Sequence, residues 1–128
     1  MNKLIVKDLY KTYSMGFFAR KFVQAVRGVS FGVNNKEVVS IVGESGSGKT
    51  TVAKMILRLL PPTSGDIIFE NKNIWILKDK EELRKFRKEM HAVFQDPFSS
   101  YNPFYPVERT LWQAIKLLDE KMEKKEGY

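Results

Sequence analysis

The sequence predicts an α/β fold, and three consecutive segments carry that prediction. Residues 38–42 read VVSIV, a short and nearly continuous apolar run of the kind expected for a buried parallel strand. Residues 43–50 read GESGSGKT, a glycine-rich loop. Apolar residues then recur at helical spacing, and they are Val52, Met55, Ile56, Leu59 and Leu60. A strand, a glycine-rich loop and a helix in this order predict the central unit of the fold.

Further strands are expected on both sides of this unit. Residues 4–6 and 22–33 are rich in β-branched and aromatic side chains, and residues 66–70 and 91–94 form short apolar stretches. Asparagine-containing turns are expected at residues 34–36 and 71–73, because asparagine tolerates the left-handed backbone conformation.

Three helices are expected in all. The first should be stopped by Pro61 and Pro62, which cannot continue its hydrogen-bond ladder. Asp79 and Glu82 resemble an N-terminal capping pair for a second helix, whose apolar positions are Leu83, Phe86 and Met90. Thr110 with Gln113 would cap a last helix that uses Leu111, Ile115, Leu118 and Met122. The proline-containing stretch 95–106 between these helices is expected to be a loop.

Composition narrows the class of protein. The chain has 128 residues, the size of one ordinary domain, and contains no cysteine for disulfides or thiolate metal sites. No apolar run approaches the ~20 residues that a membrane-spanning helix needs. The net charge is +7, but the basic residues are scattered among acids. We therefore expect solvated helix faces and no nucleic-acid partner.

Residues 43–50 match the phosphate-binding pattern G-x-x-x-x-G-K-[ST] at every defined position. Glycine lets the loop turn tightly and lets backbone N–H groups approach phosphate oxygens. Lys49 is expected to reach the β- and γ-phosphates, Thr50 to bind magnesium, and Thr51 to donate to the α-phosphate. The predicted phosphate-binding residues are Gly43, Ser45, Gly46, Ser47, Gly48, Lys49, Thr50 and Thr51.

Four segments resemble the ATP-binding subunits of ABC transporters. Residues 43–51 resemble their Walker A motif, residues 11–13 (KTY) the position of their aromatic A-loop residue, and residues 57–67 their helix-to-strand passage. Residues 94–103 read FQDPFSSYNP and are similar to the Q-loop of oligopeptide and dipeptide importers. The resemblance implies a P-loop core with an antiparallel β subdomain. It also implies a nucleotide-binding part over 1–95, and over 96–128 the Q-loop and the start of a helical subdomain.

The resemblance also implies roles, partners and a location. Tyr13 would stack on adenine, although Tyr10 could be mistaken for it, and Gln95 would contact the magnesium ion or the attacking water. Lys49 and Gln95 are then the expected catalytic residues, Thr50 and Gln95 the metal ligands, and ATP with Mg²⁺ the cofactors. Transmembrane permease subunits would dock at the Q-loop, a second ATP-binding subunit would complete the enzyme, and the complex would lie at the cytoplasmic face of the membrane.

Some positions depart from the family pattern. Lys36 and Asn71 stand where glycines are usual, which concerns local turns and not the phosphates. The 128 residues contain no signature motif, Walker B motif or switch histidine, so this chain alone is expected to be inactive. The alternatives are a nucleotide-binding module without turnover, or a related nickel or sugar importer subunit. His91, Trp75 and Trp112 are expected to be structural.

Overall fold

The computed structural model describes residues 2–15, 21–93 and 106–118. The chain divides into two compact units, Met1–Lys78 and Asp79–Tyr128. The elements of the first unit are β1 (Asn2–Met15), β2 (Lys21–Asn34), α1 (Lys49–Ile56), β3 (Ser64–Phe69) and β4 (Lys72–Asn73). Those of the second unit are α2 (Lys80–Glu89) and α3 (Val107–Leu118).

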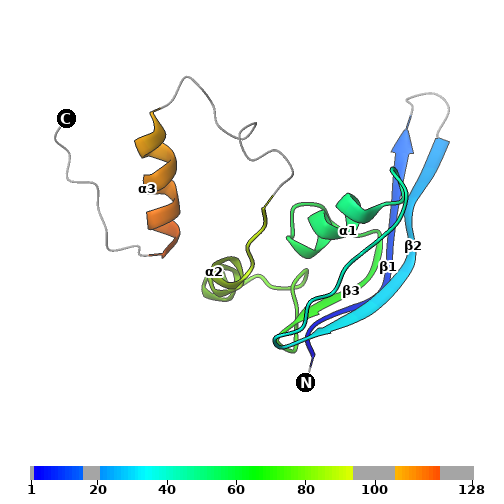
Figure 1. The fold of residues 1–128 in the computed structure, drawn as a ribbon, viewed down its shortest axis with the longest axis horizontal. Coiled ribbons are helices and arrows are strands. Elements are labelled where there is room, and N and C mark those ends of the chain that lie inside the picture. The colour runs from blue at the N-terminus through cyan, green and yellow to red at the C-terminus, as the bar shows by residue number, and fades with distance from the viewer. Residues whose placement is uncertain (1, 16–20, 94–105, 119–128) are drawn as a thin grey trace. The chain divides into compact units, whose positions relative to one another are not determined.

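The first unit is built on a four-stranded antiparallel sheet with the order β2-β1-β3-β4 (Figure 1). β1 and β2 form a long hairpin, and β3 pairs with the other edge of β1. The strands expected over 4–6, 22–33 and 66–70 are thus confirmed. β1 and β2 are each 14 residues long, and β1 extends well past the three residues that the apolar pattern indicated.

The core of this unit lies between the sheet and α1. Val52 and Met55 of α1 are buried, and Met55 has no exposed surface. Burial of one such side chain stabilises the fold by about 1.5–3 kcal/mol. The buried apolar residues that complete the core are Val6, Leu9, Val26, Ile67, Phe69 and Ile74. Packing of α1 on the sheet therefore holds the start of the helix, at Lys49, at a defined place.

α1 ends earlier than the apolar stripe predicted. Its last helical residue is Ile56, and Arg58 takes a left-handed φ of 58°. The N–H of Arg58 donates to Met55 O at 3.1 Å and that of Leu59 to Lys54 O at 2.9 Å, the paired bonds of a Schellman motif. This motif, and not the two prolines that follow, terminates the helix. Leu59 lies outside the helix and is 63% exposed.

Arg58 is held in its unusual backbone conformation by its side chain. The guanidinium donates to Leu77 O at 2.9 Å and lies 5.7 Å from the centre of the Trp75 ring. The Trp75 indole in turn donates to Met55 O at 3.2 Å. Trp75 is half-buried, so the expectation that it is a packing residue is confirmed.

Two turns use the left-handed conformation without glycine. Glu70 and Asn71, at φ 47° and 65°, join β3 to β4, and Phe69 pairs with Lys72 across them. Two successive positive φ angles are typical of a type I′ hairpin turn. This turn lies one residue earlier than predicted. Lys36 has φ 62° in the turn after β2, which explains why glycine suits both positions.

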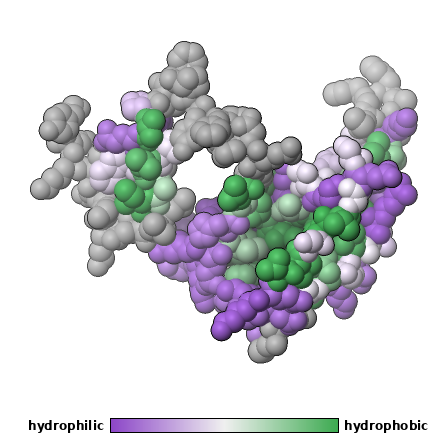
Figure 2. Space-filling model, viewed as in Figure 1, coloured by the Kyte–Doolittle hydropathy of each residue, from purple (hydrophilic) through white to green (hydrophobic). Residues whose placement is uncertain are grey.

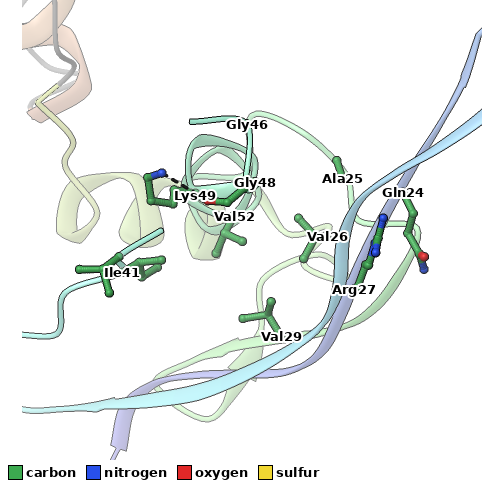
Figure 3. A pocket seen from close by; sticks show the side chains of 12 residues that line it. Gln24, Ala25, Val26, Arg27, Val29, Ile41, Gly46, Gly48, Lys49 and Val52 are labelled. Atoms are coloured by element: carbon green, nitrogen blue, oxygen red, sulfur yellow. Dashed lines mark hydrogen bonds between the residues drawn. The ribbon is translucent and has the colours of Figure 1, made fainter. Parts of the chain in front are cut away.

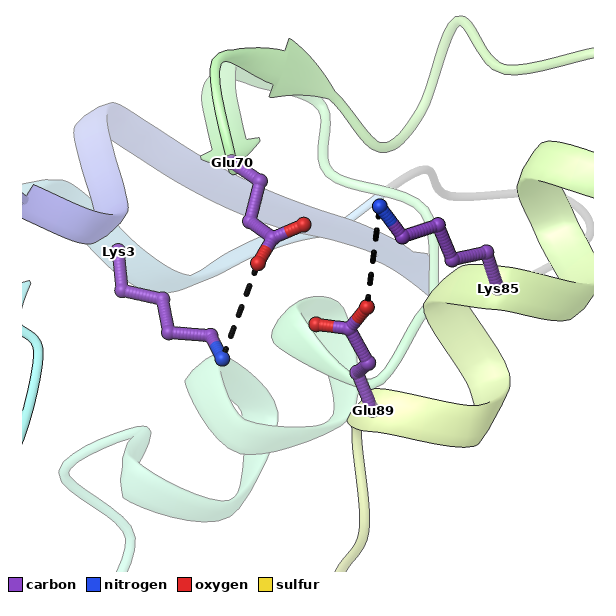
Figure 4. Close-up of polar contacts among 4 residues, drawn as sticks. All are labelled: Lys3, Glu70, Lys85 and Glu89. Carbon is purple, nitrogen blue, oxygen red and sulfur yellow. Dashed lines mark ion pairs between the residues drawn. The ribbon is translucent and has the colours of Figure 1, made fainter.

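Surface ion pairs add little to these elements. Lys3 lies 3.8 Å from Glu70 in the first unit, and Lys85 lies 4.0 Å from Glu89, one turn further along α2 (Figure 4). Exposed pairs of this kind contribute about 0–1 kcal/mol each.

Two expected strands are absent from the described part of the chain. Residues 38–42 and 91–93 have no regular secondary structure, and Val38 and Val93 are 92% and 94% exposed. A strand needs a neighbour to pair its backbone groups. All the strands within the described residues pair antiparallel with one another as β1 to β4, and none is paired with these segments. The prediction of a buried parallel strand at 38–42 is therefore wrong for this structure.

The second unit contains α2 and α3. Asp79 caps α2 by accepting from the Glu82 N–H at 3.0 Å, as predicted, and Phe86 is the buried residue of that helix. α3 begins at Val107, directly after Pro106, so Thr110 lies inside the helix and does not cap it. Three exposed apolar residues recur at a spacing of four along α3, and they are Val107, Leu111 and Ile115. Figure 2 shows the hydrophobic surface along this helix. Of the helices described, none is both long and apolar enough to cross a membrane.

Candidate functional site

The glycine-rich loop directly precedes α1, as the motif predicted. A turn closes it, because the Ser47 N–H donates to Glu44 O at 3.2 Å. Gly46 and Gly48 have φ angles of 81° and 95°, which side chains rarely tolerate. Gly48 is the N-cap of α1, and Lys49 is the first helical residue.

Lys49 folds back over the loop that precedes it. Its ammonium group donates to Gly43 O at 2.7 Å, to Glu44 O at 2.6 Å and to the Ser47 hydroxyl at 3.3 Å. Figure 3 shows the side chain turned toward the loop at the start of α1. The loop therefore surrounds a positive charge, which is the requirement for a site that binds a multiply charged anion.

The loop also has the shape of an anion cradle. A Cβ on Gly48 would overlap the backbone oxygen of Ala25, and one on Gly43 would lie 2.7 Å from the Ser47 hydroxyl oxygen. No side chain caps Gly48, so the N–H groups of the first turn of α1 are not covered by a capping oxygen. Uncovered N–H groups and the positive end of the helix dipole favour a phosphate at this place. The residues thus fit a nucleotide polyphosphate.

A cavity of about 460 Å³ lies beside the loop. This volume is within the usual range for small-molecule sites. Its walls come from β2, the segment before the loop, the loop itself and the first turn of α1 (Figure 3). The lining residues are Gln24, Ala25, Val26, Arg27, Val29, Ile41, Val42, Gly46, Ser47, Gly48, Lys49 and Val52. The contribution of β2 was not predicted, since no phosphate motif signals it.

Tyr13 lies on β1, next to the strand that lines the cavity, but is not itself part of the lining. It pairs with Val23, and its neighbour Thr12 pairs with the cavity residue Gln24. Tyr13 is 37% exposed. Tyr10 is equally exposed, but its hydroxyl lies over Gly28 on the neighbouring strand. Of the two tyrosines, Tyr13 lies nearer to the end of β1, where the chain leads into β2.

The remaining predicted site residues fall into two groups. Thr50 and Thr51 lie in the first turn of α1, Thr50 exposed and Thr51 half-buried, and Ser45 is exposed in the loop turn. Gln95 and residues 96–105, which belong to the predicted permease-docking loop, lie outside the described residues.

Comparison with known families identifies the class of protein. The ABC transporter family matches residues 26–126, most of the chain. The chain therefore belongs to the ABC transporter family. The match includes β2 from residue 26 onward, the glycine-rich loop and α1, so the cradle described above lies within the matched ABC transporter domain.

Curated relatives point to ATP-binding subunits of peptide transporters. The chain is 41% identical to the oligopeptide transport ATP-binding protein AppF of Bacillus subtilis over 88% of its length. It is 45% identical to the dipeptide transport ATP-binding protein DppD of the same organism over 80% of its length. The matches cover 34% and 32% of those two relatives, so the chain spans about a third of their length.

Solved structures show the same fold. The dimeric ABC transporter cassette MJ0796 superimposes with a TM-score of 0.62 at 29% identity, over 88% of this chain and 54% of that one. A post-hydrolysis state of MJ0796 bound to ADP and phosphate matches with a TM-score of 0.56 at 36% identity, over 66% of this chain and 35% of that one. The fold is thus of the ABC ATPase type, with an antiparallel β subdomain. The 128 residues contain no signature motif and no Walker B motif.

Proposed function

We propose that this chain binds ATP with Mg²⁺ at the loop before α1. The observation that carries the proposal is the Lys49 ammonium, which lies within hydrogen-bond distance of three oxygens of its own loop. Phosphate oxygens can take the place of these partners, because they are stronger acceptors than neutral carbonyls. The nucleotide would then bind to a loop that is already closed around the lysine.

Each residue of the loop has a distinct part in this proposal. Lys49 places a positive charge at the β- and γ-phosphates, and Thr50 holds the magnesium ion with its hydroxyl. Backbone N–H groups of the loop and of the first turn of α1 bind phosphate oxygens, and Tyr13 takes the adenine. The binding residues are Tyr13, Gly43, Ser45, Gly46, Ser47, Gly48, Lys49, Thr50 and Thr51. Bound Mg²⁺ would neutralise charge that develops on the phosphates.

Gln95 has a second role in the proposal. Its amide would contact the magnesium ion or the attacking water, so Gln95 and Lys49 together orient the reacting groups. The residues after it, 96–106, would dock on transmembrane permease subunits and transmit the state of the nucleotide. A second ATP-binding subunit, identical or related, would complete the site for hydrolysis.

We propose, further, that the subunit couples ATP hydrolysis to import of peptides at the cytoplasmic face of the membrane. The names of the relatives AppF and DppD and the FQDPFSSYNP stretch support peptides as the substrate class. One alternative is the subunit of a related nickel or sugar importer. A second alternative is a nucleotide-binding module without turnover, since the 128 residues contain no Walker B carboxylate.

The coupling proposal is tested in a subunit that contains this chain, reconstituted with its permeases in vesicles. Gln95→Ala should reduce peptide-stimulated ATP hydrolysis at least tenfold, while the affinity for ATP should stay within about twofold of the wild type. The reason is that the Gln95 amide is proposed to act on the water and the metal ion and not on the adenine. Asn35→Ala, in an exposed turn, serves as the control. Full peptide-stimulated hydrolysis in Gln95→Ala would overturn this role, and stimulation by nickel or sugars in place of peptides would replace the substrate class.

A further inference from the structure

Lys11 covers one face of the Tyr13 ring. The two residues are separated by one position on β1, so their side chains lie on the same side of the strand. The Lys11 ammonium is 5.3 Å from the centre of the ring. This is within the ~6 Å at which a cation is attracted to the face of an aromatic ring.

The Lys11 ammonium is itself anchored. It donates a hydrogen bond of 2.6 Å to the backbone oxygen of Pro61, in the segment that follows α1. The same segment is bonded to β1 on both sides of Lys11, because the Thr63 N–H donates to Tyr10 O at 2.9 Å and the Thr12 N–H donates to the Thr63 hydroxyl at 2.9 Å. The position of the cation is therefore defined by three contacts between β1 and the 61–63 segment.

The Tyr13 side chain needs such a support. Pairing with Val23 fixes its backbone, but the residue is 37% exposed. An exposed ring on a strand samples several rotamers unless a neighbour holds it. Lys11 supplies that contact, and more than a third of the Tyr13 surface stays exposed.

We propose that Lys11 is a positioning residue for the adenine side of the site. It holds the exposed Tyr13 ring in the orientation in which it would stack on the base. The inference rests on the proposed function, in which the adenine of ATP stacks on Tyr13, and assigns to Lys11 a part in base recognition separate from phosphate binding.

The test compares ATP with inorganic tripolyphosphate, which carries the phosphates without the base. Affinities are measured by titration calorimetry on the 128-residue chain. Lys11→Met should weaken ATP binding about two- to fivefold, the size expected for one exposed cation–π contact. Tripolyphosphate binding should not change, and Lys11→Arg should retain the wild-type affinity for ATP. Lys7→Met removes the same charge from an exposed position of β1 and should alter neither ligand.

A second variant separates the charge from the anchor. Lys11→Gln keeps a donor for Pro61 O but has no cation, so it should show the same selective loss as Lys11→Met. Wild-type ATP affinity in Lys11→Gln would overturn the proposal. In a Tyr13→Ala background, Lys11→Met should cause no additional loss, because the ring through which it acts is gone.

The remaining outcomes are also decisive. An equal loss of ATP and tripolyphosphate affinity in Lys11→Met would show that Lys11 acts on the phosphates or on the fold, and would overturn the proposal. Equal affinity of the wild-type chain for both ligands would show that the adenine does not contribute to binding, and would overturn this inference. Failure of the proposed function itself is different, since the wild-type chain would then bind neither ligand.

Discussion

The backbone oxygen of Ala25 lies against Gly48, so closely that a Cβ on Gly48 would overlap it. Ala25 is the extra residue of β2 at a register shift, where Lys11 pairs with Val26 but Thr12 pairs with Gln24. A bulge of this kind bends a strand and redirects its backbone groups. Here it brings the β1–β2 hairpin into contact with the end of the phosphate loop.

Gly48→Ala should therefore disrupt the loop through two effects, the overlap with Ala25 and a φ of 95°. We expect a loss of about 1–3 kcal/mol in the free energy of unfolding from the backbone strain alone, and weaker ATP binding. Gly46→Ala is the matched control, because Gly46 also has a positive φ of 81° but no atom within 4 Å of an added Cβ. Urea denaturation of both variants checks this. Equal destabilisation would show that the Ala25 contact has no role.

Tyr13 should contribute to ATP affinity through stacking. Tyr13→Ala should weaken ATP binding by about 1–3 kcal/mol, the value of one base on an aromatic ring, whereas Tyr13→Trp should retain most of it. Tyr10→Ala is the control, since the Tyr10 hydroxyl lies over Gly28, which does not line the cavity. Titration calorimetry with ATP decides between the two tyrosines. A larger effect of Tyr10→Ala would show that Tyr10, and not Tyr13, stacks on the adenine.

The parts of this structure that could be predicted from sequence are those with local causes. The loop at 43–48 follows from its glycines, the hairpin from its β-branched residues, and the start of α2 from the side chain of Asp79. The end of α1 could not be predicted, because it depends on contacts of Arg58 with Trp75 and Leu77, which are distant in sequence.

The site residues also divide into those with local causes, which could be predicted, and those that depend on distant contacts. The phosphate-binding residues follow from a motif, since each glycine answers a local need for space or a positive φ. The β2 wall of the cavity and the Lys11 contact with Tyr13 depend on strand pairing and on the path of the chain after α1. The strand expected at 38–42 fails for a related reason, because an apolar run becomes a strand only where a neighbour pairs with it.

The exposed segment 38–42 allows a direct check of that correction. Val38 and Val42 are 92% and 88% exposed, so replacing both with lysine should change the free energy of unfolding by no more than about 0.5 kcal/mol per site. Ile67→Ala, at a fully buried position of β3, should cost about 2–5 kcal/mol and serves as the reference. Denaturant unfolding of the three proteins gives the comparison. A loss in the double variant as large as that in Ile67→Ala would show that residues 38–42 are a buried strand after all.

The contacts of Lys49 support the central claim, that the loop before α1 is an ATP site. Its ammonium is the cation that the loop encloses, whereas Lys54 of the same helix is exposed in the last turn. The two variants Lys49→Ala and Lys54→Ala remove the same charge from the two ends of α1. A difference between them therefore reports on the loop and not on net charge.

The measurement that tests this claim most directly is titration calorimetry of the chain with Mg²⁺ and ATP, in the wild type and in both lysine variants. Lys49→Ala should weaken ATP binding at least tenfold, equivalent to ~1.4 kcal/mol or more, and Lys54→Ala should bind as the wild type does. Equal ATP affinity in the wild type and in Lys49→Ala would contradict the assignment of the site.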